Sequence, residues 1–260
     1  MIRINNENWV VVTPWHNEDQ QQAFLDAWSG RNHLMMLRDS EKCGCAVMKN
    51  RCIAKAVEDG ADGVVVLDDD CFPDVNGPQS FEELIVLHVE TLKPQPVEMS
   101  IEVTYPPSRG TPYHCRNIEM PVAASMGFWT EVGDYDAVAQ LVHGPTYPMR
   151  FDTRPVFGRY FPLCGMNLAF RPKQWMPWCG FINVPRFDDI WMGWLFQKKA
   201  YAENHCFNLA GPLVRHSRQS NVWANLRDEA VHLEANDTLW RDIAMHPSLD
   251  YSELRRLLPV

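Results

Sequence analysis

The chain has 260 residues, enough for one sizeable domain or two small ones, and its hydrophobic content of 46% with ten tryptophans indicates a packed globular protein. A formal net charge of −9 argues against loose, charge-driven binding to nucleic acid or to anionic membranes. No apolar run approaches the ~20 residues of a membrane span and the first residues lack a signal-peptide pattern, so we expect a cytoplasmic protein with mostly reduced cysteines.

The N-terminal part of the chain predicts strands and helices in alternation. Short apolar runs predict strands at 9–13, 34–37 and 64–67, and apolar residues at helical spacing predict helices at 19–29 and 46–59. Strand–helix–strand units of this kind form a parallel sheet with helices packed on its faces. We therefore predict an α/β fold with a central, mostly parallel sheet and helices on both faces. Sheets of this class bind ligands at the carboxyl ends of their strands.

Three consecutive aspartates, Asp68, Asp69 and Asp70, follow the third predicted strand directly. Because side chains alternate along an extended segment, Asp68 and Asp70 should face one way and Asp69 the other. Like charges this close raise the free energy unless a positive group lies between them, and Mg²⁺ or Mn²⁺ prefers oxygen ligands of this kind. The alternative is an exposed acidic turn, in which Asp is common. The strand before the triplet and its βαβ context favour a site.

The segment 74–107 predicts loops with one helix near 80–89, and further candidate residues follow it. Arg109 and Arg116 of RGTPYHCR have the fork geometry that matches phosphate oxygens, although solvated surface arginines would look the same. Asp188 and Asp189 lie at a predicted helix N-terminus, where carboxylates cap free amides or act as a general base or substrate clamp. His216 could complete a metal site or serve a structural role.

Six sequence blocks in a set order together resemble one family. They are DDDCF, RGxPxxxR, GxWxxxxDYDA, FPxCGMNLAF, RxDDxWxGW and HSxxSNxxxNL. In this order they resemble the reversibly glycosylated polypeptides, also called UDP-arabinopyranose mutases, between Trp9 and Leu226. The strand that ends in an Asp motif also resembles the wider group of GT-A glycosyltransferases. The resemblance therefore implies a GT-A fold in a single nucleotide-sugar domain.

The resemblance also implies a UDP-sugar substrate held through Mn²⁺ or Mg²⁺, and it assigns roles to residues of this chain. The metal ion would bind Asp68, Asp70 and His216. The catalytic residues would be Arg109, at the position that becomes glycosylated in the family, with Arg116, Asp188 and Asp189. The nucleotide would contact Asp39, Lys49, Asn50, Arg51, Asp68, Asp69 and Asn221.

Three functions stay open at this point. The first is a metal-dependent UDP-arabinopyranose mutase, which interconverts the pyranose and furanose forms of a UDP-pentose. The second is a glycosyltransferase that moves arabinose or a related sugar from UDP onto an acceptor hydroxyl of a polysaccharide, a small molecule or a hydroxymethylated DNA base. The third is a non-catalytic nucleotide-sugar binding protein. It is disfavoured because the chain carries the Asp triplet, both arginines, the second Asp pair and His216.

Two segments depart from the family pattern. We divide the chain into a GT-A-like domain at 1–226 and a C-terminal helical extension at 227–260 packed on it. This extension is shorter than the long helical extension usual in the family. The segment between DDDCF and RGTP also has no recognisable family pattern. Both differences could alter assembly or admit an external acceptor.

Overall fold

The run of valines before the Asp triplet forms a central strand of the sheet. The computed structural model describes residues 1–97, 118–144, 153–217, 221–245 and 251–257. In it β4 (Gly63–Leu67) is buried along its whole length, because it pairs with β2 (Glu7–Trp15) on one side and with β10 (Asn167–Phe170) on the other. A strand covered on both faces has a continuous apolar sequence, as this one does.

The described strands form a nine-stranded sheet in which the long strands share one direction. Strands β2, β3 (Leu34–Arg38) and β4 are parallel, and so are β8 (Val122–Glu131) and β11 (Cys206–His216). The short strand β10 lies between β4 and β8 and is antiparallel to both, so the two groups of parallel strands run in the same direction. The sheet is therefore mixed, and the predicted α/β class is confirmed.

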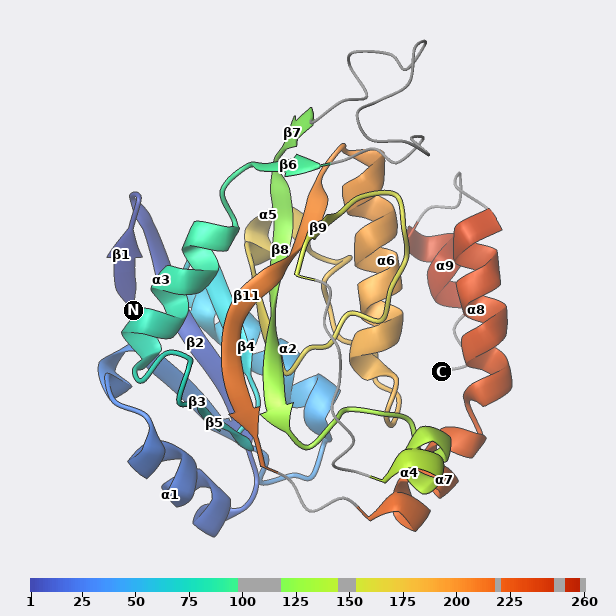
Figure 1. The fold of residues 1–260 in the computed structure, drawn as a ribbon, viewed down its shortest axis with the longest axis horizontal. Coiled ribbons are helices and arrows are strands. Elements are labelled where there is room, and N and C mark those ends of the chain that lie inside the picture. The colour runs from blue at the N-terminus through green and yellow to red at the C-terminus, as the bar shows by residue number, and fades with distance from the viewer. Residues whose placement is uncertain (98–117, 145–152, 218–220, 246–250, 258–260) are drawn as a thin grey trace.

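Helices cover both faces of this sheet (Figure 1). On one face α2 (Cys45–Glu58) packs on β2 and β3, as expected for a crossover helix. On the other face α3 (Phe81–Thr91) packs on β8 and β11. The helix α6 (Asp188–Ala202) lies between β11 and α8 (Leu233–Met245). This arrangement leaves the carboxyl ends of the parallel strands beside the first turns of α2 and α6.

The remaining elements are shorter or lie at the edges. They are β1 (Ile2–Ile4), α1 (Glu18–Ala27), the 3-10 helix η1 (Arg31–His33), β5 (Cys71–Pro73), β6 (Gln95–Val97), β7 (Ile118–Met120), α4 (Ala137–His143), β9 (Pro155–Val156), α5 (Pro172–Trp175), α7 (Val222–Ala230) and α9 (Tyr251–Leu257).

Among the C-terminal helices, α8 contacts the body of the fold through α6. The indole N–H of Trp191 on α6 donates to Oδ1 of Asn236 on α8 at 3.0 Å. Nζ of Lys198, also on α6, donates to the carbonyl of Ile243 at 3.2 Å. Residue 226, where we divide the chain, lies inside α7, and the division into domain and extension stays a prediction.

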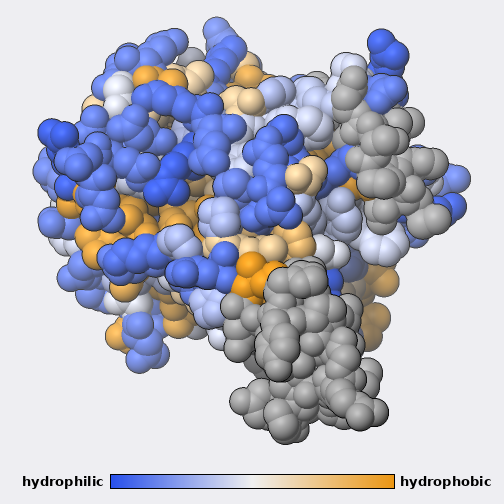
Figure 2. Space-filling model, turned by 90° about the horizontal axis from the view of Figure 1, so that it is seen from above, coloured by the Kyte–Doolittle hydropathy of each residue, from blue (hydrophilic) through white to orange (hydrophobic). Residues whose placement is uncertain are grey.

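Most of the described surface visible in Figure 2 is hydrophilic, with smaller hydrophobic areas between. No helix within the described ranges is long and apolar enough to cross a membrane. The seven cysteines of the described part of the chain are free, and five of them are buried. This agrees with the expectation that they act mostly as small apolar residues.

Candidate active site

A cavity of about 210 Å³ opens at the carboxyl edge of the sheet, where the fold class places its ligands. Its walls come from the end of β4, the end of β11, the first turns of α2 and α6, and the loops before β10 and after β8. The lining residues are Cys45, Lys49, Asp68, Asp70, Asp134, Cys164, Met166, Arg186, Asp188, Asp189 and His216. Of the residues predicted to act at the site, the structure thus gathers six around one space.

A buried ion pair joins α2 to the end of β4. Nζ of Lys49 lies 2.7 Å from Oδ1 of Asp68, and the lysine side chain is only 4% exposed. The same ammonium group donates to the carbonyl of Gly165 at 3.3 Å. Burial is the largest single influence and disfavours the charged lysine, but the combined attraction of Asp68, Cys45 and the two aspartates of α6 outweighs it and raises the pKa of Lys49 well above its usual value. The cavity therefore holds a permanent positive charge at its α2 wall.

The other two aspartates of the triplet lie in a turn, closed by the backbone N–H of Cys71 on the carbonyl of Asp68 at 3.0 Å, and not in the extended segment that the sequence predicts. Asp70 lines the cavity together with Asp68, whereas Asp69 is not among the lining residues. Oδ2 of Asp70 lies 3.5 Å from Nε2 of His216, whose other ring nitrogen lies 2.9 Å from the carbonyl of Val132. Burial opposes protonation of His216, but the neighbouring Asp70 outweighs it and raises the pKa of the imidazole. The end of β11 is thus linked to the triplet.

The second aspartate pair begins α6 and faces the same space. The N-cap position belongs to Phe187, which makes no side-chain capping bond. Oδ2 of Asp189 instead accepts from the backbone N–H of Gly165 at 2.8 Å, across the cavity loop. A side chain at Gly165 would meet the Phe181 ring at 2.4 Å, so only glycine allows this approach. Both carboxylates are in the first turn, which the helix dipole favours, but their contacts reach beyond capping.

Burial raises the pKa of this pair. Burial and the charge of neighbouring Asp188 raise the pKa of Asp189 to about 7, although the positive charge of Lys49 opposes this shift. Burial likewise raises the pKa of Asp188. Carboxylates that lie near neutrality in pKa are suited to hold or move a proton at physiological pH.

Five of the predicted nucleotide contacts are not among the residues that line the cavity, and Asp69 is one of them. The other four are Asp39, Asn50, Arg51 and Asn221. Each has a local partner that accounts for its side chain. Asp39 accepts from the backbone N–H groups of Cys43 and Gly44, Asn50 bonds both backbone groups of Phe181, Arg51 pairs with exposed Glu41, and Asn221 caps α7 through Ala224. Arg109 and Arg116 lie outside the described residues, so their roles stay predictions.

Sequence reasoning missed Arg186 and Asp134, which also line the cavity. Nε of Arg186 donates to Oε1 of Glu229 at 3.0 Å, and its side chain is 19% exposed. Both missed residues fall inside blocks that the sequence had singled out, RxDDxWxGW and the DYDA block. The block pattern could have identified them, but only the fold shows that they face the aspartate pairs.

The lining side chains suit a hard divalent cation in donor chemistry. Five of them are carboxylates, and Oδ2 of Asp188 has no hydrogen-bond partner among the described residues. No group of three His, Cys, Asp or Glu within the described ranges is close enough to hold a metal ion by itself. Mg²⁺ and Mn²⁺ commonly bind one or two protein carboxylates and complete their shell with substrate phosphates and water. The cavity fits this pattern, in which the protein supplies one or two carboxylates and the substrate supplies further ligands.

The chain is similar to one family of known proteins. The family model for reversibly glycosylated polypeptides matches residues 61–241. The probable UDP-arabinopyranose mutase 1 of Pisum sativum is 30% identical over 183 residues, which cover 64% of this chain and 50% of that protein. The UDP-arabinopyranose mutase 1 of Arabidopsis thaliana is 29% identical over 186 residues, with 64% and 51% covered. That of Oryza sativa subsp. japonica is 29% identical over 183 residues, with 64% and 50% covered.

The chain spans about half the length of the curated relatives it matches, and the matched part contains the whole cavity lining after Ala61. It includes the Asp triplet, Asp134, the FPxCGMNLAF block and the first turn of α6. Because the family model covers more than half of its residues, this chain belongs to the reversibly glycosylated polypeptide family.

Proposed function

We propose that the chain is a UDP-sugar enzyme of the UDP-arabinopyranose mutase type, which interconverts the pyranose and furanose forms of a UDP-pentose. The observation that carries the proposal is the cavity itself. The Lys49–Asp68 ion pair and the Asp188–Asp189 pair line one space, at the edge of the sheet where this fold class binds ligands. The names of the relatives supply the sugar and the reaction type.

The nucleotide diphosphate would bind on the side of the cavity that carries positive charge. Lys49 stays protonated there, and Arg186 presents a guanidinium whose Nε is already held by Glu229. Asp68 and Asp70 would supply carboxylate ligands to Mn²⁺ or Mg²⁺, and UDP phosphates and water would complete its shell. His216, the third ligand predicted from sequence, would act through its contact with Asp70. The ion would neutralise negative charge on a departing UDP. These groups stabilise the leaving nucleotide, which is the first requirement of the reaction.

The sugar would lie toward the N-terminus of α6. Carboxylates of Asp188 and Asp189 can stabilise an oxocarbenium-like anomeric carbon once the bond to UDP breaks. The freed sugar then changes its ring form by exchanging which hydroxyl oxygen closes on that carbon, and UDP reattaches. The pKa of Asp189, raised to about 7, allows this residue to hold the proton that the exchange displaces. The family resemblance adds Arg109 and Arg116, which would hold the released sugar.

A second candidate is glycosyl transfer from UDP to an acceptor hydroxyl. The unpartnered Oδ2 of Asp188 favours it, because a carboxylate oxygen without a protein donor can accept the proton of an incoming hydroxyl. A mutase that returns the sugar to UDP needs no external acceptor. The acceptors proposed from sequence, including a hydroxymethylated DNA base, stay predictions.

Product analysis separates the two candidates. The chain is incubated with UDP-arabinopyranose and Mn²⁺ without any acceptor, and the nucleotides are followed by chromatography. Appearance of UDP-arabinofuranose supports the mutase. Slow release of free UDP without the isomer supports the transferase. An intact substrate, with no binding of UDP detected by calorimetry, would contradict both and leave the chain without a nucleotide-sugar activity.

A further inference from the structure

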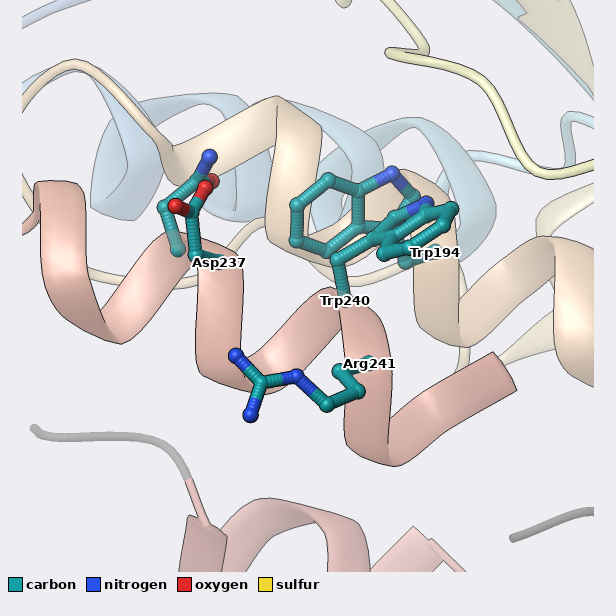
Figure 3. A pocket seen from close by; sticks show the side chains of 5 residues that line it. Trp194, Asp237, Trp240 and Arg241 are labelled. Atoms are coloured by element: carbon teal, nitrogen blue, oxygen red, sulfur yellow. The ribbon is translucent and has the colours of Figure 1, made fainter. Parts of the chain in front are cut away.

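A second pocket lies between α6 and α8, on the side of α6 that faces away from the sheet (Figures 1 and 3). Its volume is about 330 Å³. Trp194 enters it from α6, and the other four lining residues come from one stretch of α8, namely Asn236, Asp237, Trp240 and Arg241. None of them lines the candidate active site, so the two spaces are separate.

The polar groups of this pocket are only partly used by the protein. Asn236 accepts from Trp191 through Oδ1, which fixes its amide and leaves Nδ2 available as a donor. Asp237 and Arg241, one helical turn apart on α8, form no ion pair with each other or with another described residue. Their charges cancel across the pocket, so the pocket as a whole favours a neutral, polar ligand over an anion or a cation.

Two indole rings give the pocket its apolar surface. The ring of Trp240 is 47% exposed, which is costly for so large an apolar group without a partner. Trp194 is 4% exposed, and its indole N–H has no acceptor among the described residues. An unpaired buried donor costs roughly 1–3 kcal/mol. The neighbouring Trp191 shows the contrast, since its N–H is satisfied by Asn236.

We propose that this pocket binds a neutral saccharide. Sugar rings combine apolar C–H faces, which pack on indole rings, with hydroxyl groups that donate to Asp237 and accept from Asn236 and Arg241. Ligand pockets typically have roughly 300–1,000 Å³, so the observed volume fits about one sugar ring with its neighbours outside. A ligand oxygen in the pocket would supply the acceptor that the indole N–H of Trp194 lacks.

The pocket would hold a glycan against α6, on the side of this helix that faces α8. The first turn of the same helix lines the candidate active site. Asp188 and Asp189 begin α6, and Trp194 lies on the same helix but faces α8. A saccharide could occupy the pocket whether or not a nucleotide occupies the cavity. Its role would be to keep a glycan chain near the enzyme, so occupancy is separable from catalysis.

Saturation-transfer NMR titration of the full chain with arabinotriose, and with cellotriose as a hexose counterpart, tests the proposal. We expect saturable binding of at least one of them. Replacement Trp240→Ala should weaken binding about 2- to 13-fold, which corresponds to the loss of one aromatic contact of about 0.5–1.5 kcal/mol. The matched control is Trp223→Ala, which removes a tryptophan that is 68% exposed on α7 and outside the pocket, and which should leave affinity unchanged.

Four results would overturn the proposal. The first is the absence of saturable binding up to the solubility limit of both sugars. The second is equal affinity of the wild type and Trp240→Ala. The third is displacement of the sugar by UDP, which would place the sugar in the cavity. The fourth is self-association in sedimentation that Trp240→Ala abolishes, which would make the pocket a protein interface. If Trp240→Ala misfolds by circular dichroism, Arg241→Ala takes its place with the same expected direction.

Discussion

The guanidinium of Arg186 donates through Nε to Oε1 of Glu229 at 3.0 Å, and this bond joins α7 to the wall of the candidate active site. The second oxygen of Glu229 accepts from the backbone N–H of Ala137 at 2.6 Å, at the start of α4. Arg186 has a φ of +68°, which is uncommon for a residue other than glycine. One buried carboxylate therefore holds a strained cavity residue and two helices in place.

Replacement Glu229→Gln keeps the shape of this side chain but removes its charge. We expect unfolding to become easier by roughly 1–3 kcal/mol, because a charge-assisted hydrogen bond in a buried site is weakened. We also expect a higher KM for the UDP-sugar with a smaller change in kcat, since Arg186 loses its anchor. Steady-state kinetics and thermal unfolding measure both. The control is Glu234→Gln, on the exposed first turn of α8, and an unchanged KM in Glu229→Gln would show that Arg186 needs no anchor.

Replacement Asp70→Ala tests the metal assignment. This residue lines the cavity and contacts His216, so we expect UDP binding to lose its dependence on Mn²⁺. Calorimetric titration with UDP, with and without Mn²⁺, gives the two affinities directly. Asp26→Ala removes an exposed carboxylate on α1 and serves as the control. The assignment is wrong if Asp70→Ala binds UDP as tightly as the wild type and responds to Mn²⁺ in the same way.

Replacement Arg109→Ala tests the residue carried over from the family. We expect turnover to be lost while UDP affinity stays close to that of the wild type, because the guanidinium would act on the sugar and not on the nucleotide. Chromatographic product analysis and UDP titration are the two measurements. Arg31→Ala, an exposed arginine far along the chain from the block, is the control. Normal turnover in Arg109→Ala would remove this arginine from the mechanism.

Replacement Asp189→Asn should change the pH dependence of stability in metal-free buffer. Because burial raises the pKa of Asp189 to about 7 from its ordinary value of 3.8, the folded state binds more protons than the unfolded state between these values. Stability therefore falls as pH rises through that window, with a slope of at most about 1.4 kcal/mol per pH unit for one group. Asp189→Asn should lose this part of the slope and be relatively more stable at pH 8. Equal slopes in both proteins would mean that Asp189 titrates normally.

The same variant separates catalysis from helix capping. Asn can still accept from Gly165, so the local contact survives while the charge is lost. We expect turnover to fall sharply with a small change in melting temperature. The control is Asp19→Asn, an exposed carboxylate in the first turn of α1, which changes only a helix-dipole interaction. A large drop in melting temperature with normal turnover would support capping as the role of Asp189.

The N-terminal half of the fold could be predicted from sequence because its signals are local. The strand at 64–67 is one apolar run inside β4, and the helix at 46–59 matches α2 to within one residue at each end. The separation of Asp69 from Asp68 and Asp70 was predicted from extended geometry, whereas the structure produces it in a turn that begins at Asp68. Short-range periodicity is sufficient for such elements.

The second half was less predictable because its partners are distant in sequence. The segment 127–135 reads as aromatic and turn-rich, yet Gly127 to Glu131 belong to the buried strand β8. Its partner β11 is irregular where it passes Gly127 and Gly211, which blurs the alternation. The contact of Arg186 with Glu229 joins residues 43 apart in sequence. No local pattern identifies such a pair, whereas the sheet and α6 place it directly.

An anomalous difference map from a crystal grown with UDP and Mn²⁺ tests the central claim most directly. The account predicts a manganese peak beside Asp70, with the diphosphate of UDP between that peak and Lys49 in the cavity of about 210 Å³. A well-ordered UDP with its diphosphate outside this cavity, or a manganese peak remote from the Asp triplet, would contradict it.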